Sequence, residues 1–573
     1  MRIRAGNETV SVILYMVTYL SLNPVYEKAV EFAASRCHGP IGNDLKKVVW
    51  DVESGRFSNI KEAMGVFSRK WSLWNEDFVK SLIILQLIEA QTTQEGRNEI
   101  LMMATDRIMT STYKKMEKYA FGLKIPSLLL LLFGITMPLM ALVMFPLISI
   151  FLTNSINPFY VAVGYDLILP FFLWWFLFRM ISKRPATYSH SEKLEEVPPK
   201  KYLEIRKLGI KLPIIPVAFL LGLLICLPGI LYFIQLYSQF SIIFSRYPRP
   251  QAVLKWGEYC LSRYEPGTMM ADTFKAMFVI WGVSAGIIFA TFFRSNEPYK
   301  FDQFIRKLES DFTDGLFELQ SALRQNIPIE TALQKVIEHY RRLRKGSSPM
   351  AVFFSSLYYR LARMPISLKQ ALFGKEGLIT KLPSTMIKNI MGVVVSSLSR
   401  GPLIASAVVK NIFSYLNRLK EIEHIIKKTL KDVLSNLTLQ GKYISPFIAA
   451  IVASSAVVMI QILQAIAVAI KNIETMYGFG TNIGGSISKT LSLIKLERVM
   501  PPTLMEVIAG IYLVEVVIIT AIFITGIHRG FNKVYRDYLI WRMMLVAILL
   551  FSLVFFTMVR LFQPIILEIG VGK

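Results

Sequence analysis

Apolar residues follow two different patterns along the chain. In the first pattern they form seven nearly continuous runs, each about as long as the ~20 residues that cross a ~30 Å hydrocarbon core. The runs therefore predict seven transmembrane helices, the third of which is interrupted by Pro228 and Gly229. The predicted spans are residues 126–152, 158–181, 213–236, 274–293, 444–470, 505–527 and 541–563.

In the second pattern apolar residues recur at spacings of three and four, which predicts amphipathic helices. This pattern fills two long polar segments, residues 1–124 and 294–442, and neither contains a run of alternating strand-like positions. The rest of the chain forms two membrane parts. Residues 125–293 contain the first four predicted spans and a basic loop at 182–212, and residues 443–573 contain the last three spans. The predicted fold class is an all-α polytopic membrane protein with two cytoplasmic helical bundles.

The two polar segments share an order of elements. "NPVYEKAV" (23–30) matches "NIPIETAL" (326–333), and each opens three short predicted helices, the last centred on Ala63 or Ala371. The second copy is longer by one loop, "RKGSS" (344–348). A period of about 300 residues indicates a duplicated six-helix domain that feeds a membrane helix, and excludes a solenoid. Coincidence is the alternative, because Ala and Glu are common near helix starts. Further helices are predicted over 75–90, 95–124, 383–397 and 403–440.

The formal net charge of +25 and the mean hydropathy of +0.45 have a common explanation. Loop 182–212 carries eight basic residues against four glutamates, segment 294–442 carries 24 against 12, and loop 528–540 adds three more. The intervening connection 153–157 is uncharged. Basic connections stay in the cytoplasm, which places the N-terminus inside and the C-terminus outside. A nucleic-acid partner would need a basic face interleaved with aromatics, and we do not favour one because positive-inside sorting accounts for most of the charge.

One stretch near the C-terminus links this pattern to a known family. "PPTLMEVIAGIYLVEVVIITAIFITGIHRG" (501–530) combines Gly510-Ile511-Tyr512, Glu515 and a closing Gly526 and Gly530. With two helical bundles that each precede membrane helices, the chain resembles the type II secretion F/PilC superfamily. The stretch is most similar to the archaeal branch, the FlaJ/ArlJ archaellum platforms and the related archaeal type IV pilus platforms.

The resemblance implies a non-enzymatic role in the cytoplasmic membrane. Such platforms couple a hexameric cytoplasmic secretion ATPase to the assembly or rotation of a filament built from pilin- or archaellin-like subunits. The resemblance also implies a homodimer, the commonest symmetric assembly. A polytopic transporter is the alternative, but its chain would be concentrated in the membrane and would show matching helix breaks in two halves. The predicted spans hold less than a third of this chain.

No catalytic site is predicted, and the chain is therefore not expected to be an enzyme. The nearest match to a phosphate-binding loop, "GTNIGGSISKT" (480–490), has Ser486 where the lysine should be and falls outside the cell in the predicted topology. The five histidines show no metal-ligand spacing, and three cysteines make neither a disulfide framework nor a metal cluster. We expect no cofactor and no metal.

Two carboxylates well inside predicted spans are candidate site residues, Asp166 in the second span and Glu515 near the middle of the sixth. A charge at mid-bilayer costs about 2.5–3.5 kcal/mol on insertion scales, so such groups face protein or water. One interpretation is a proton relay or coupling site. The other, which we favour, is a structural hydrogen bond to the fifth span. The candidate partners there are Gln461, Gln464, Ser454 and Ser455.

Two basic clusters are candidate docking sites for the ATPase. The first comprises Arg341, Arg342, Arg344 and Lys345, at the end of a predicted helix. The second comprises Lys427, Lys428 and Lys431, on a helix that runs toward the membrane. Such clusters attract an acidic partner over a Debye length of about 8 Å at physiological salt. The second cluster has an equal alternative, contact with anionic lipid headgroups at about 1 kcal/mol per lysine.

Overall fold

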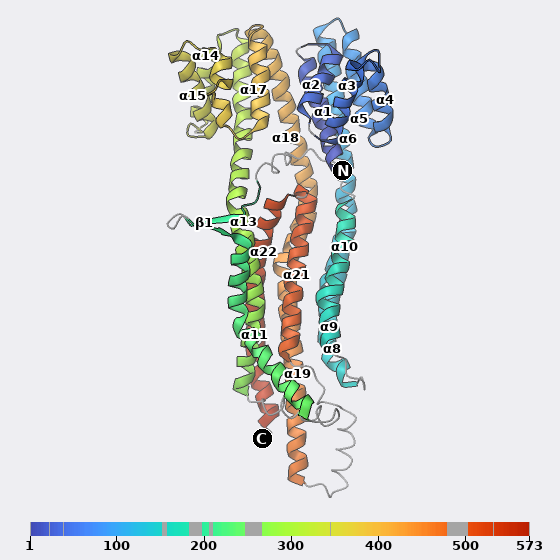
Figure 1. Cartoon of the computed structure of the whole chain (residues 1–573), viewed down its shortest axis with the longest axis vertical. Coiled ribbons are helices and arrows are strands. Elements are labelled where there is room, and N and C mark those ends of the chain that lie inside the picture. The colour runs from blue at the N-terminus through green and yellow to red at the C-terminus, as the bar shows by residue number, and fades with distance from the viewer. Residues whose placement is uncertain are drawn as a thin grey trace. The chain divides into compact units, whose positions relative to one another are not determined.

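The computed structural model is built almost entirely of helices (Figure 1). Seven helical segments in the described residues are long and apolar enough to cross a membrane, so the chain is an all-α polytopic membrane protein. They are Gln94–Met144, Tyr160–Ile181, Ile214–Gln239, Ala271–Arg324, Glu423–Ile462, Pro502–Arg529 and Lys533–Pro564. The structure describes residues 2–21, 23–37, 39–151, 158–182, 198–205, 210–246, 266–343, 345–477, 502–530 and 532–571.

The chain divides into two compact units. Unit 1 contains the described residues of 1–122 and 300–431, and unit 2 those of 123–182, 198–299 and 432–573. Because α13 (Pro266–Arg324) and α18 (Pro402–Leu439) each cross a boundary, part of each helix belongs to each unit.

The first half of unit 1 contains six α-helices and a 3-10 turn over the described residues 2–122. Their ends follow from capping chemistry: the Asn59 side chain accepts the Glu62 N–H at the start of α4, and Asn75 accepts the Phe78 N–H at the start of α5. Pro40 opens α3, where a missing N–H is tolerated. The elements are α1 (Arg2–Leu20), α2 (Tyr26–Arg36), α3 (Pro40–Glu53), α4 (Ile60–Ser72), α5 (Glu76–Gln86), η1 (Leu87–Ala90) and α6 (Gln94–Gly122).

Within the described residues, the second half of unit 1 contains the C-terminal part of α13 and five further α-helices, with a 3-10 turn after the fourth helix instead of the fifth. Ser348, Ser367 and Ser384 cap three of these helices, and Ser367 completes a capping box with Gln370. Beside α18, the elements are α14 (Ile329–Arg342), α15 (Pro349–Arg363), α16 (Leu368–Phe373), η5 (Leu378–Lys381) and α17 (Thr385–Leu398). The helices predicted over 383–397 and 403–440 agree with α17 and α18 to within two residues.

Amphipathic helices bury their apolar faces throughout unit 1. Tyr26, Phe78, Phe312 and Phe354 are among its fully buried large side chains. Such burial stabilises a domain by roughly 1.5–3 kcal/mol for each large side chain. Two polar bonds connect the halves, from Arg36 Nη1 to Asn389 Oδ1 at 3.0 Å and from Arg400 Nη1 to Asn23 Oδ1 at 2.9 Å.

Unit 2 is organised around three helices that pack against one another, α19 (Ser445–Tyr477), α21 (Pro502–Arg529) and α22 (Lys533–Val571). Most of α21 is buried, as expected for a helix that is apolar on all sides. The helices around them include α7 (Lys124–Leu131), α8 (Met137–Phe151), α9 (Pro158–Val163), α10 (Leu169–Ile181), α11 (Ile214–Arg246) and the N-terminal part of α13.

Two features of unit 2 differ from the sequence predictions. Helix α11 continues through Pro228 and Gly229, so the interruption expected there is wrong. Gly229 instead serves packing, because a Cβ at this position would lie 2.6 Å from Val279 Cγ2 of α13. The predicted basic loop also contains an antiparallel hairpin of β1 (Tyr202–Ile205) and β2 (Ile210–Pro213). Its strands are only four residues long, the shortest length over which alternation indicates a strand.

Within the described residues, three π-helical turns interrupt the spans and lie against α21. They are η2 (Leu132–Thr136), η3 (Gly164–Ile168) and η6 (Gln440–Ile444). The α21 helix packs on η3 and η6 and bonds to η2 through Tyr512. The turn η6 begins 308 residues after η2, the same offset that separates Ala371 from Ala63. The two turns therefore occupy equivalent places after the two halves of unit 1.

Candidate functional site

The first basic cluster lies at the C-terminal end of α14. Arg341 and Arg342 are exposed, and neither forms an ion pair within the described part of the chain. They occupy the last helical turn, where positive charge also favours the helix dipole. Arg344 lies outside the described residues. The two described arginines are thus available to a partner.

Lys345 is engaged differently from its neighbours. Its Nζ lies 3.1 Å from Asp311 Oδ1 and 3.0 Å from Asp314 Oδ2, both on α13. These two hydrogen bonds raise the pKa of Lys345 above its usual value, against the smaller opposing effect of burial. The hydroxyl of Tyr340 also donates to the carbonyl of Asp311. Lys345 therefore joins the 344–348 loop to α13, and its charge is already compensated within the bundle.

Sequence reasoning missed Glu8, the acidic residue in the first half of unit 1 that corresponds in position to Asp311 in the second half. Glu8 lies 303 residues before Asp311, the same offset that separates Ala29 from Ala332. Its buried carboxylate accepts hydrogen bonds from the backbone N–H of Ile41 at 2.7 Å and of Gly42 at 3.3 Å, at the start of α3. The acid thus caps a helix directly in the first half and binds a lysine of the longer loop in the second.

Lys420 was also missed, although it lies in the same charged group as Lys345. Its Nζ donates to the carbonyl oxygen of Ser310 at 3.1 Å. Burial lowers the pKa of Lys420, while the nearby charge of Asp314 opposes the effect. Only the packing of α18 on α13 brings it there, so local sequence carried no signal for it.

The second basic cluster lies on α18. Lys427 pairs with Glu423 one turn earlier, with 2.8 Å between Nζ and Oε1. Both groups are about half exposed, so the pair contributes little, at most about 0.5 kcal/mol. Lys428 and Lys431 are exposed. Neither Lys428 nor Lys431 forms an ion pair within the described part of the chain.

The two intramembrane carboxylates approach each other in unit 2. Asp166 lies in η3, which packs on α21, and Glu515 of α21 is its charged neighbour. Beside them the rings of Tyr165 and Tyr512 meet edge to face, with centroids 6.2 Å apart. The hydroxyl of Tyr512 donates to the carbonyl of Gly134 in η2. One face of α21 therefore presents a tyrosine and a carboxyl group to two π-helical turns.

The predicted partners of Glu515 in the fifth span are placed as follows. Gln461 is buried in α19, and the side chain of Gln464 lies outside the described part. Ser454 Oγ donates to the carbonyl of Ile451 in its own helix. Within the described residues, Glu515 Oε2 and Asp166 Oδ1 are buried without a hydrogen-bond partner. The polar neighbours of Glu515 that the structure describes therefore include a second carboxyl group, Asp166, on another span.

No group of three or more His, Cys, Asp or Glu residues within the described ranges could hold a metal ion. The "GTNIGGSISKT" stretch lies outside those ranges. No family model, curated protein or solved structure matches this chain. What the protein does must therefore be argued from its own residues.

Proposed function

We propose that the chain is a membrane assembly platform of the type II secretion F/PilC kind. In this role it couples a cytoplasmic secretion ATPase to the assembly or rotation of an archaellum- or pilus-like filament, as a homodimer in the cytoplasmic membrane. Its N-terminus lies inside and its C-terminus outside the cell. The platform hydrolyses no nucleotide itself and acts by transmitting movement.

The main support is the repeated order of elements in unit 1. Helices α1 to α6 and α13 to α18 follow one another in the same sequence, each half with Pro at the start of its third helix, Pro40 or Pro349. These two halves are the duplicated cytoplasmic bundles of the proposal. A transporter has no use for a second polar helical domain. A scaffold that receives force from a motor can use both copies as contact surfaces for that motor.

The π-helical turns give further support. Each half of unit 1 is followed along the chain by such a turn, η2 or η6, at equivalent positions beside α21. An extra residue in a helix is costly and often marks a functional site. A Cβ added at Gly441 of η6 would lie 2.8 Å from Thr520 Cγ2, so this contact depends on glycine. In the proposal, α21 is the element that both halves act upon.

Arg341 and Arg342 are the proposed ATPase contact. Changing Arg341→Glu and Arg342→Glu together should abolish co-purification with the ATPase and leave membrane insertion intact. A matched control makes the same charge change at Lys428→Glu and Lys431→Glu, which should retain the ATPase and weaken association with anionic vesicles. Binding by the arginine variant at low salt would refute the docking site. If only the variant with Lys428→Glu and Lys431→Glu lost the ATPase, the ATPase contact would lie on α18 instead.

The proposal as a whole is tested by deleting the gene and inspecting cells for surface filaments and swimming. Filaments in the deletion strain would refute it. The transporter alternative has one specific observation in its favour, the neighbouring carboxyl groups of Asp166 and Glu515, which could carry protons. Proteoliposomes that accumulate a solute through the purified chain, with uptake lost in Glu515→Gln, would favour that alternative.

A further inference from the structure

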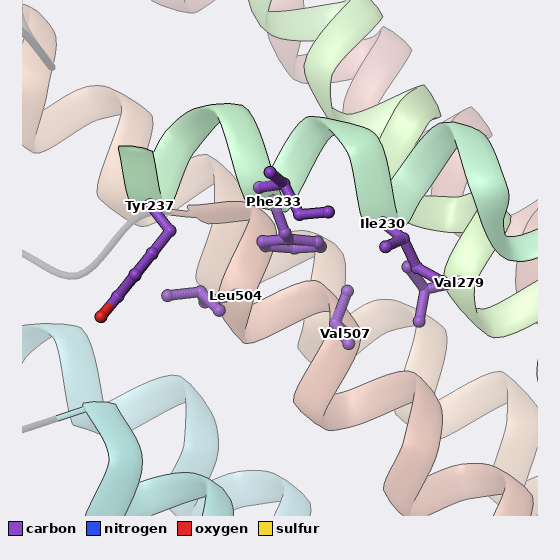
Figure 2. Close-up of a pocket in the computed structure, with 7 residues that line it drawn as sticks. Ile230, Phe233, Tyr237, Val279, Leu504 and Val507 are labelled. Atoms are coloured by element: carbon purple, nitrogen blue, oxygen red, sulfur yellow. The ribbon is translucent and has the colours of Figure 1, made fainter. Parts of the chain in front are cut away.

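An apolar groove runs between α11 and α21 in unit 2 (Figure 2). One wall consists of Ile230, Phe233, Ile234 and Tyr237, which share one face of α11 because they are spaced by three and four residues. The volume of the groove is about 410 Å³. Among the described residues, no polar side chain other than Tyr237 lines it.

The groove lies where two helices, α11 and α21, both pack on a third helix, α13. Val279 and Ile280 are neighbours on α13. Val279 packs against Gly229 of α11, and Ile280 packs against Gly510 of α21. Both contacts require glycine, because a Cβ at position 229 would overlap Val279 and a Cβ at position 510 would overlap Ile280. Val279 of α13 therefore lines the bottom of the groove, between α11 and α21.

The opposite wall consists of Leu504 and Val507 of α21. Figure 2 shows Phe233 directed toward these two side chains, whereas the hydroxyl of Tyr237 points away from the lining. Ile234 and Tyr237 remain 57% and 70% exposed, so the groove opens outward on a membrane-spanning segment. Water does not fill such a space in a bilayer, and a void would lose the dispersion contacts of its lining.

We infer that this groove binds one acyl chain of a membrane phospholipid. The inference is independent of the proposed function. The wall on α11 extends from Ile230 to Tyr237, a rise of about 10 Å at 1.5 Å per residue. The described lining is apolar along its length except for the Tyr237 hydroxyl at one end, which is the polarity of an acyl chain beneath its ester group. A single hydrocarbon chain fits, and the Tyr237 hydroxyl then lies toward the ester and headgroup region, where tyrosines are enriched.

The test uses the full chain with the photoreactive residue p-benzoylphenylalanine at position 234, reconstituted in dioleoylphosphatidylcholine and then diluted into excess detergent. Irradiation should still attach phosphatidylcholine, seen as a mass increase of the intact protein. The same residue at position 224 is the control, because Leu224 is equally exposed on α11 but lies outside the groove. Its lipid adduct should fall at least tenfold after the dilution.

A second variant fills the groove. Val507→Trp in the position-234 protein should remove the retained adduct without reducing protein yield. Should that variant fail to fold, the comparison of positions 234 and 224 still decides. Equal loss of the adduct at both positions would overturn the inference. Cross-linking of position 234 to a second copy or to another membrane protein would overturn it as well, because a helix would then occupy the groove.

Discussion

The ion pairs of Lys345 with Asp311 and Asp314 predict that this lysine stabilises the bundle and does not bind the ATPase, and a single substitution can distinguish the two roles. Lys345→Met keeps the aliphatic stem and removes the charge that Asp311 and Asp314 share. The side chain of Asp311 is only 6% exposed, whereas Lys345 is 43% and Asp314 37% exposed. The change therefore leaves a nearly buried carboxylate without its cation.

The expected size follows from these exposures. A fully exposed ion pair contributes about 0.2–1 kcal/mol, and a hydrogen bond to a buried charged group about 1.5–3 kcal/mol. Because the lysine is partly screened by water, we expect a loss between these limits, about 1–2 kcal/mol. The local opening equilibrium of α13 and α14 should then rise by a factor of about 5–30.

Hydrogen exchange measured by mass spectrometry on the full chain in detergent reports this change. Peptides from 311–343 should exchange faster in Lys345→Met, and Lys375→Met serves as the control. Lys375 is an exposed lysine of the same half that forms no ion pair among the described residues. Unchanged exchange together with loss of the ATPase would refute the reasoning and return Lys345 to the docking surface.

The pH dependence of the same contact has a definite sign. Hydrogen bonds with Asp314 and Asp311 raise the pKa of Lys345 in the folded state. The stabilisation from Lys345 is therefore complete below the ordinary lysine pKa of about 10.4 and is lost only as the pH rises through the higher folded value. Between pH 7 and 9 the effect of Lys345→Met should stay constant.

Three further changes have expected outcomes. Glu8→Ala leaves two backbone N–H groups at the start of α3 without an acceptor. Hydrogen exchange in α3 should then rise by about tenfold or more, as expected for a loss of about 1–3 kcal/mol. Unchanged protection of α3 would contradict this. Tyr512→Phe removes the bond to the Gly134 carbonyl, and the free energy of unfolding in detergent should fall by about 1–2 kcal/mol, an equal midpoint being the contrary result. Burial opposes ionisation of Glu89, but its bond with Lys61 at 2.5 Å lowers its pKa overall. The stability lost in Glu89→Gln should therefore be greatest above the usual glutamate pKa and shrink as the pH falls, and a difference that grows on acidification would refute this.

The sequence alone determined the elements of this protein. A membrane span depends on about twenty consecutive apolar residues, and an amphipathic helix on local spacings, so both can be read from the chain. The seven spans and the positions of α17 and α18 were predicted for this reason. The hairpin at 202–213 was missed because four-residue strands give only the shortest alternation that indicates a strand, and Pro228 was misjudged because α11 remains continuous through it.

The tertiary structure alone decided which side chains meet. Asp166 and Glu515 looked like isolated carboxyl groups until the packing of η3 on α21 made them neighbours. Lys345 looked like part of a free basic cluster until α13 supplied Asp311 and Asp314. Contacts between residues so distant in sequence depend on how helices pack, and helix packing depends on many small steric fits, such as the glycines facing Val279 and Ile280, that no local pattern records.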